Sequence, residues 1–209
     1  MKNFLAFAAL VFVGIAAQGQ KDTRKTFDAS EIERIVLSGD QIFRITASTS
    51  PEKTIEVRTH SEGEYFNDIS FDSRIADGTL FLDSRFREIL ESGYDKLSAH
   101  KVFSMEVEMM VPEGIELVVN SNLASVFLSG AFAEVLVQLS SGSCYLSAFS
   151  GDATVNTFGG NIEIGTDLTK ASITADSRHG TVEVPSATEG KNKIVLTSIH
   201  GNIKVHKTK

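Results

Sequence analysis

Hydrophobic and polar residues alternate in short runs along the C-terminal half of the chain, and pairs of runs are joined by turns that mostly contain glycine. Alternation with a period of two is typical of β-strands, because successive side chains point to opposite faces of a sheet. The pattern occurs five times, at steps of 18, 18, 20 and 21 residues. The copies read LVVNSNLASVFL from Leu117, VLVQLSSGSCYL from Val135, ATVNTFGGNIEI from Ala153, SITADSRHGTVEV from Ser172 and IVLTSIHGNIKV from Ile194.

A β-rich unit that repeats at a nearly fixed length, with no helix between copies, predicts a β-solenoid. We therefore expect an all-β, single-domain parallel β-helix, right-handed as parallel crossovers usually are. Stacking in sequence order would place aliphatic ladders inside. These ladders comprise Val119, Val137, Val155, Ile173 and Leu196 in the first runs, and Val126/Leu128, Cys144/Leu146, Ile162/Ile164, Val182/Val184 and Ile203/Val205 in the second runs.

The turns of the repeat carry glycine at one equivalent position in four copies. We expect this position to need a backbone conformation that disfavours a Cβ atom. The first copy has Ala124 there, so its turn should differ. The four glycines are Gly142, Gly160, Gly180 and Gly201.

The outward positions of the second runs change character along the repeat. Phe127 and Tyr145 are aromatic, whereas Glu163, Glu183 and Lys204 are charged. Apolar side chains on an outer face require a cover or a partner. Two interpretations follow: the N-terminal half packs over Phe127 and Tyr145, or these rings form a surface that binds a partner.

The first residues have the features of an export signal: one lysine, an apolar stretch and small residues before a cleavage site. We expect a signal peptide over 1–19, a leader over 20–26 without regular structure, a β-solenoid domain over 27–206 and a tail over 207–209. The apolar stretch is short for a membrane span and runs directly into polar sequence, so no integral span is expected in the mature chain.

The N-terminal half already has the alternation of β-strands, without the regular repeat. Asp77-Gly78 lies between two alternating runs and predicts a tight hairpin turn. The segment Ser84–Lys101 is the one stretch with helical character, and we expect a short helical insertion there. Its Phe86, Ile89 and Leu90 would share one face of the helix.

Charge and cysteine content narrow the classes of function. The formal net charge is −7 and there is no basic stripe, which argues against binding to nucleic acid. Cys144 is the single cysteine, so no disulfide within the chain is expected. It occupies an inward position of the repeat, which is typical of a small buried hydrophobic residue and not of a nucleophile.

The chain resembles the putative auto-transporter adhesin family, also called the head GIN domain, over roughly Phe27 to Val205. The resemblance rests on DGTLFL, MEVEMMVPEGIELVV, SSGSCYLS and FGGNIEI. It implies a secreted or cell-envelope β-solenoid of Gram-negative bacteria, and no catalytic signature comes with it. The longer copies from Ala171 onward and the segment Ser84–Lys101 depart from the family's regularity.

The sequence offers one candidate site for catalysis and one for metal binding. Glu163 and Glu183 fall at equivalent outward positions, but Lys204 continues the same row, which favours a solvated charged face. His179 and His200 each precede a turn glycine and should stack on adjacent copies. With Asp176 nearby they suggest zinc, yet exposed turn histidines are the simpler interpretation. We expect no metal, no cofactor and no catalytic residue.

These observations predict an exported, non-enzymatic binding module, adhesin-like, in the periplasm, on the outer surface or outside the cell. Its partner would be a protein or glycan of the cell envelope. The alternatives are a degenerate polysaccharide-processing β-helix, or an envelope component that self-associates through the ends of the solenoid. The interaction surface would involve Phe127, Tyr145, Asp176, Arg178, His179 and His200.

Overall fold

The computed structural model describes residues 20–63, 69–86, 103–186 and 189–208, and the predicted signal peptide lies outside these ranges. The described residues form one 15-stranded β-sheet, and no helix occurs among them. None of the described segments is a helix long and apolar enough to cross a membrane. The all-β class predicted from the alternation is therefore confirmed.

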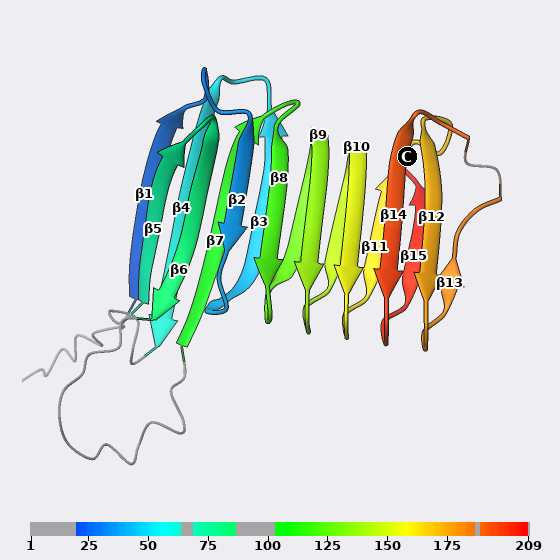
Figure 1. Ribbon diagram of the computed structural model, residues 1–209. Helices are drawn as coiled ribbons and strands as arrows, with labels where there is room; N and C mark the ends of the chain where they lie inside the picture. The colour runs from blue at the N-terminus through cyan, green and yellow to red at the C-terminus, as the bar shows by residue number, and fades with distance from the viewer. Residues whose placement is uncertain (1–19, 64–68, 87–102, 187–188, 209) are drawn as a thin grey trace, which may run out of the picture.

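The sheet contains two rows of strands, which overlap one another in the view of Figure 1. The first row runs, in spatial order, through β1 (Gln20–Asp28), β4 (Thr54–Gly63), β7 (Phe103–Pro112), β3 (Ile42–Ser50), β9 (Ser125–Leu139), β10 (Cys144–Thr157), β11 (Ile162–Thr166), β15 (Ile203–Lys207) and β13 (Val182–Glu183). The second row runs through β5 (Ile69–Ala76), β6 (Thr79–Phe86), β2 (Arg34–Ser38), β8 (Glu116–Ser121), β9, β10, β14 (Asn192–Ser198) and β12 (Ala171–Ser177).

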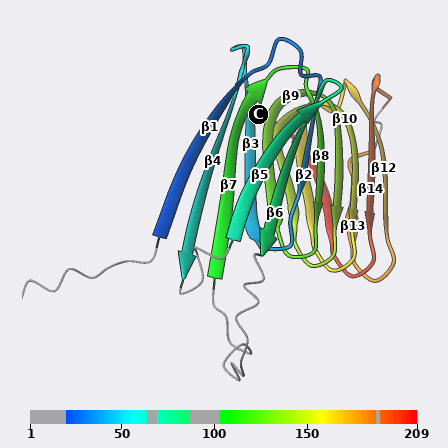
Figure 2. The ribbon, with the colours of Figure 1, turned by 60° about the vertical axis from the view of Figure 1, so that its left-hand side comes forward.

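Strands β9 and β10 belong to both rows and join them. The first half of β9 pairs with β3 and its second half with β8, and the chain bends at Gly130, where φ is +109°. In β10 the equivalent bend lies at Gly151, where φ is +128°. Both values favour glycine. Figure 2 shows the resulting curvature, by which the two rows come to face one another.

Pairing from β8 onward is parallel and places equivalent residues of the repeat side by side. In one row the register joins Val119 to Val137 and Val137 to Val155. All three side chains are fully buried in one hydrophobic core. Complete burial of a valine or isoleucine stabilises a fold by roughly 1.5–3 kcal/mol, so the stacked ladders supply most of the cohesion of this half.

The spatial order of the last two copies differs from the expected one. Strand β14 pairs directly with β10, joining Val155 to Leu196, and β12 pairs on the far side of β14. Ile173 therefore lies opposite Ile194 and not beside Val155. In the other row, Ile203 stands between Ile162 and Val182.

The side chains give a physical reason for this order. Leu196 and Ile203 are buried, whereas their neighbours toward the edge are the smaller, part-exposed Ala175 and the 42% exposed Val182. The copy with larger inward residues occupies the interior, and the copy with less apolar volume forms the edge. Val182 shares the inward face with Ile203, as expected, but it remains exposed because it lies on the edge strand.

Backbone and side-chain bonds in the turns also hold this order. A side-chain oxygen of each copy accepts the backbone N–H of the next one along the sheet. Asn161 Oδ1 accepts from Asn202 N at 2.8 Å, and Asn202 Oδ1 accepts from Thr181 N at 2.9 Å. Ser143 Oγ accepts from Asn161 N at 3.1 Å. These bonds satisfy N–H groups at the turns, where strand pairing is interrupted.

The turn glycines are required for a different reason from the one expected. A Cβ atom on Gly160 would lie 1.8 Å from the carbonyl oxygen of Gly142, and one on Gly142 would lie 1.6 Å from that of Ala124. Neither glycine has a positive φ. Close approach of one turn to the next, and not an unusual backbone conformation, excludes a side chain at this position.

Two predictions about the N-terminal half meet different outcomes. The hairpin at Asp77-Gly78 is confirmed: β5 and β6 pair antiparallel, with φ of +48° and +69° at these residues, as a two-residue turn with both φ positive requires. The helix expected from Ser84 does not begin there. Ser84–Phe86 continues β6, since buried Ser84 prolongs the alternation of Leu80 and Leu82, and 87–101 lies outside the described residues.

The segment 20–26 is a strand and not an unstructured leader. It forms most of β1, which pairs antiparallel with β4 over its whole length. Phe27, at the end of the strand, packs against the core. The charged residues of β1 gave no apolar alternation, so pairing with β4 could not be inferred from them.

We predict that Val155→Asp unfolds or severely destabilises the protein, while Glu163→Gln is nearly silent. Val155 is fully buried, so the change buries an unpaired carboxylate and should cost more than about 4 kcal/mol. Glu163 is half-exposed, with its Oε1 3.7 Å from His206 Nδ1, and an exposed pair contributes at most about 1 kcal/mol. Urea denaturation measures both, and equal effects would contradict the assignment of faces.

We also predict opposite outcomes for two adjacent glycines. Gly160→Ala should destabilise the protein by about 1–3 kcal/mol, because the new methyl group meets a neighbouring backbone carbonyl. Gly159→Ala is the matched control, since its methyl group would lie 3.5 Å from the nearest atom. Thermal denaturation should lower the Tm of the first variant alone. A Tm equally unaffected in both would show that the turns are not closely packed.

Candidate functional site

Three side chains from neighbouring strands form a continuous outward surface, which we call the Phe127 face: Arg44, Phe127 and Tyr145. The parallel register places Phe127 beside Tyr145, with ring centroids 4.9 Å apart and planes 11° from parallel. Arg44 on β3 lies with its Cζ atom 4.9 Å from the centroid of the Phe127 ring. Its Nε atom is 3.8 Å from Glu106 Oε1. A cation over an aromatic ring contributes about 0.5–1 kcal/mol at exposed sites.

Among the described residues, the strands of the N-terminal half lie beside these rings, and Arg44 lies over Phe127. Strand β3 pairs with β9 in the same sheet, which brings Thr46 next to Phe127 in the register. Both rings remain partly accessible. Residues 87–101, which belong to the segment that could cover the rings, lie outside the described ranges.

The same outward row continues into charged residues beyond Tyr145. The register joins Tyr145 to Glu163, Glu163 to Lys204 and Lys204 to Glu183. Lys204 thus separates the two carboxylates, which had been expected to lie on adjacent copies. The row therefore alternates in charge beyond Tyr145, as in a solvated face of cross-strand charge pairs.

A second aromatic group lies at the turns. His179 and His200 stack with centroids 4.9 Å apart and planes 14° from parallel, as expected from their position before the turn glycines. The ring of Phe158 meets His200 edge-on at 5.3 Å and is 57% exposed. Sequence reasoning missed Phe158, although an exposed aromatic residue before Gly159-Gly160 was a visible signal.

The remaining predicted site residues do not converge with the Phe127 face. Asp176 lies on β12 beside Thr197, and Arg178 follows it into the turn, both exposed. Within the described part of the chain, no group of three histidine, cysteine, aspartate or glutamate residues is placed to hold a metal ion. His179 and His200 stack at adjacent turns, while Asp176 is exposed on β12.

Cys144 occupies the inward position that its place in the repeat predicted. Its side chain is completely buried, and this burial raises the pKa of the thiol above its usual range. A nucleophilic cysteine requires the thiolate, which burial disfavours. Cys144 is therefore a small core residue.

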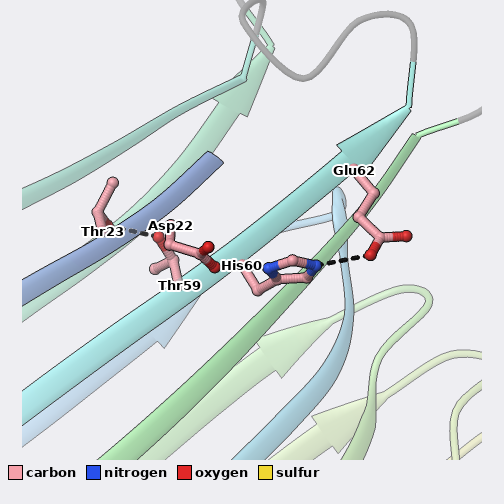
Figure 3. A network of polar contacts seen from close by, with 5 residues as sticks. All are labelled: Asp22, Thr23, Thr59, His60 and Glu62. Atoms are coloured by element: carbon pink, nitrogen blue, oxygen red, sulfur yellow. Dashed lines mark hydrogen bonds and ion pairs between the residues drawn. The ribbon is translucent and has the colours of Figure 1, made fainter. Parts of the chain in front are cut away.

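A polar cluster on β1 and β4 was not anticipated. Figure 3 shows His60 between Asp22 and Glu62. The ring's Nδ1 is 2.6 Å from Asp22 Oδ1 and its Nε2 is 2.7 Å from Glu62 Oε1. The hydrogen bond to Glu62, and then that to Asp22, raises the pKa of His60 to about 9. At neutral pH the imidazolium donates both N–H groups. His60 and Glu62 share a strand face in the sequence, but the approach of Asp22 depends on long-range pairing.

We predict that this cluster makes the free energy of unfolding fall as the pH rises into the alkaline range. The folded-state pKa of His60 is raised above its ordinary 6.5, so its contribution is fully present below pH 6.5 and is lost as pH rises through about 9. The loss should be small, because the His60 side chain is 35% exposed. Urea denaturation between pH 6 and 9.5 measures it.

The control for the pH experiment is the double variant Asp22→Asn/Glu62→Gln. It removes both acceptor charges, so its free energy of unfolding should change less with pH over this range than that of the wild type. Identical pH profiles for the two proteins would contradict the assignment of the slope to His60.

Comparison with known proteins identifies the fold. No model of a protein family matches the chain, and no curated protein matches it. The crystal structure of a putative cell adhesion protein from Clostridium sporogenes is similar, with a TM-score of 0.63 and 16% identity, over 91% of this chain and 100% of that one. A putative adhesin from Bacteroides fragilis covers 89% of this chain and 97% of its own, with a TM-score of 0.37 and 13% identity. The chain thus has the fold of a structure described as a cell adhesion protein.

Proposed function

We propose that this chain is an exported, non-enzymatic binding module with an adhesin-like role at the cell envelope or surface. In this proposal residues 1–19 are a signal peptide and 27–206 a parallel β-helix related to the head GIN domain, with β1 as its N-terminal edge. The observation that carries the proposal is the fold shared with a putative cell adhesion protein over nearly the whole length of both chains. Parallel in-register pairing across β8, β9, β10 and β14 supports the β-helix.

The Phe127 face supplies a physical basis for binding. Its aromatic rings are held by strand register, so they lose little conformational entropy when a partner covers them. Aromatic and arginine side chains are also those that contribute most strongly at protein interfaces. Arg44, Phe127 and Tyr145 together provide both types on one rigid surface.

Self-association is a second candidate function, favoured by the edge of the sheet at β12 and β13. Figure 1 shows these two strands at the end opposite β1 and β5. Val182 is 42% exposed there, and Val184 is only partly buried. An open strand edge presents backbone groups that can pair with another chain. A second copy would bind through this edge and not through the Phe127 face.

We predict that latex beads coated with residues 20–209 adhere to cultured epithelial cells or to Gram-negative bacterial cells more than albumin-coated beads do. The double variant Arg44→Ala/Tyr145→Ala should reduce adhesion about tenfold, because loss of such anchors commonly costs more than 1.4 kcal/mol of binding. Lys204→Ala, in the same outward row, is the matched control and should adhere like the wild type. Counting bound beads by flow cytometry measures this.

Three outcomes would contradict the proposal. Adhesion no greater than that of albumin beads would remove the binding role. Release of reducing or unsaturated sugars from added polysaccharides would replace it with an enzymatic one. A mass in solution that rises with protein concentration, without adhesion to cells, would favour self-association through β12 and β13.

A further inference from the structure

An open cleft lies where β2, β6, β8 and β9 end, on the side toward which their arrowheads point in Figure 1. Its volume is about 910 Å³, within the range of about 300–1,000 Å³ typical of sites for small molecules. Among the residues that line it, Leu139 alone has a large apolar side chain, and it is buried. The cleft is therefore lined by hydroxyl, amide and carboxylate groups and by Arg85.

One row of polar side chains crosses the cleft from strand to strand. The register joins Asp83 to Ser38, Ser38 to Asn120 and Asn120 to Gln138. Neighbouring strands lie about 4.8 Å apart, so these groups are evenly spaced. Among the described residues, no hydrogen bond engages the side chains of Asp83, Asn120 or Gln138. Their donors and acceptors are available to a ligand.

Other side chains of the cleft are already engaged and make its floor rigid. Asn122 N donates to Asp40 Oδ1 at 3.1 Å, and Ser140 Oγ donates to Asn122 Oδ1 at 2.8 Å. Ser121 Oγ donates to the carbonyl oxygen of Gly39 at 2.8 Å. Hydrogen bonds between neighbouring turns thus hold this part of the cleft in place. The polar side chains of the row from Asp83 to Gln138 remain available to bind a ligand.

An exposed aromatic residue lies in the turn next to the cleft. Phe158 directly follows β10, and its N–H donates to the carbonyl oxygen of Leu139, which lines the cleft, at 3.0 Å. The side chain of Phe158 is 57% exposed, and His200, on the side away from the cleft, meets its ring edge-on. The edge therefore combines free polar groups with one apolar platform.

This combination selects among ligand classes. Phosphate-bearing ligands are disfavoured, because Asp40 and Asp83 line the cleft with Arg85 as the single lining cation. A peptide that adds a strand needs a free strand edge, and β2, β8 and β9 are paired on both sides. Sugar hydroxyls both donate and accept, as amides do, and the C–H face of a sugar ring packs on an aromatic ring.

We infer that this cleft binds an uncharged glycan, with Asp83, Asn120 and Gln138 bonding its hydroxyl groups and Phe158 packing against a sugar ring. The inference rests on the proposed binding function and assigns it a ligand class and a site. The site is separate from the Phe127 face, which lies on the other row of the sheet.

The test is an array of neutral oligosaccharides, namely cello-, manno- and galacto-oligosaccharides and N-acetyllactosamine, probed with fluorescent residues 20–209. We expect binding to at least one of them, and titration calorimetry with that oligosaccharide measures its Kd. Asn120→Ala/Gln138→Ala should raise the Kd about tenfold through lost hydrogen bonds. Phe158→Ala should raise the Kd several-fold through lost ring packing.

Thr197→Ala is the matched control. Thr197 extends the same outward row through Asn156 and lies two strands beyond Gln138, outside the cleft. The Kd of the Thr197→Ala variant for the same oligosaccharide should equal that of the wild type. An unchanged Tm of each variant shows that its folding is intact. If a cleft variant melts early, Asp83→Asn, which keeps the side chain's shape, takes its place.

The outcomes separate this inference from the proposed function. Beads that adhere to cells while the array shows no binding would overturn the glycan site and leave the adhesin-like role. Glycan binding that the cleft variants leave unchanged would do the same. Failure of both the array and the bead assay would overturn both.

Discussion

In-register pairing between parallel strands is the constraint on which this structure depends. Where β8, β9, β10 and β14 pair, equivalent residues of neighbouring copies stand side by side, except at the irregularity of β10 between Ser147 and Asp152. In the inward row of Val119, Val137 and Val155, each aliphatic residue then meets another. A shift of one residue would turn every such side chain to the solvent, so burial fixes the register strongly. The rings of the Phe127 face and the polar row of the cleft are aligned by that same register.

The sequence predicted structure correctly where the pattern lay within a short stretch of residues. The period of two identified the strands, the repeated phrase identified equivalent positions, and Asp77-Gly78 identified a hairpin. The spatial order of the last two copies could not be inferred from such short stretches. It depends on which copy buries more apolar surface beside β10, and the sequence pattern of Ile194–Val205 resembles that of Ser172–Val184 too closely to decide this. Strand β1 was missed because its pairing partner, β4, and not its own composition, makes it a strand.

The candidate sites show the same division. Phe127 and Tyr145 could be identified, because outward aromatic residues in an alternating run are visible in the sequence. Arg44 could not, since it reaches Phe127 only through the pairing of β3 with β9. Asp22 reaches His60 across 38 positions of sequence, and the cleft gathers side chains from four strands. Long-range register creates these groups, so they become apparent only in three dimensions.

The position of β14 between β10 and β12 has a consequence for biosynthesis. A chain emerging from the ribosome releases β12 first, at a time when the strand that will flank it has not yet been made. The side of β10 that β14 will occupy is then open, and β12 carries a similar pattern of side chains. Premature docking of β12 at that site would have to be reversed before the native arrangement forms. The interior place of the late strand thus creates competition during folding that a strictly sequential stack would avoid.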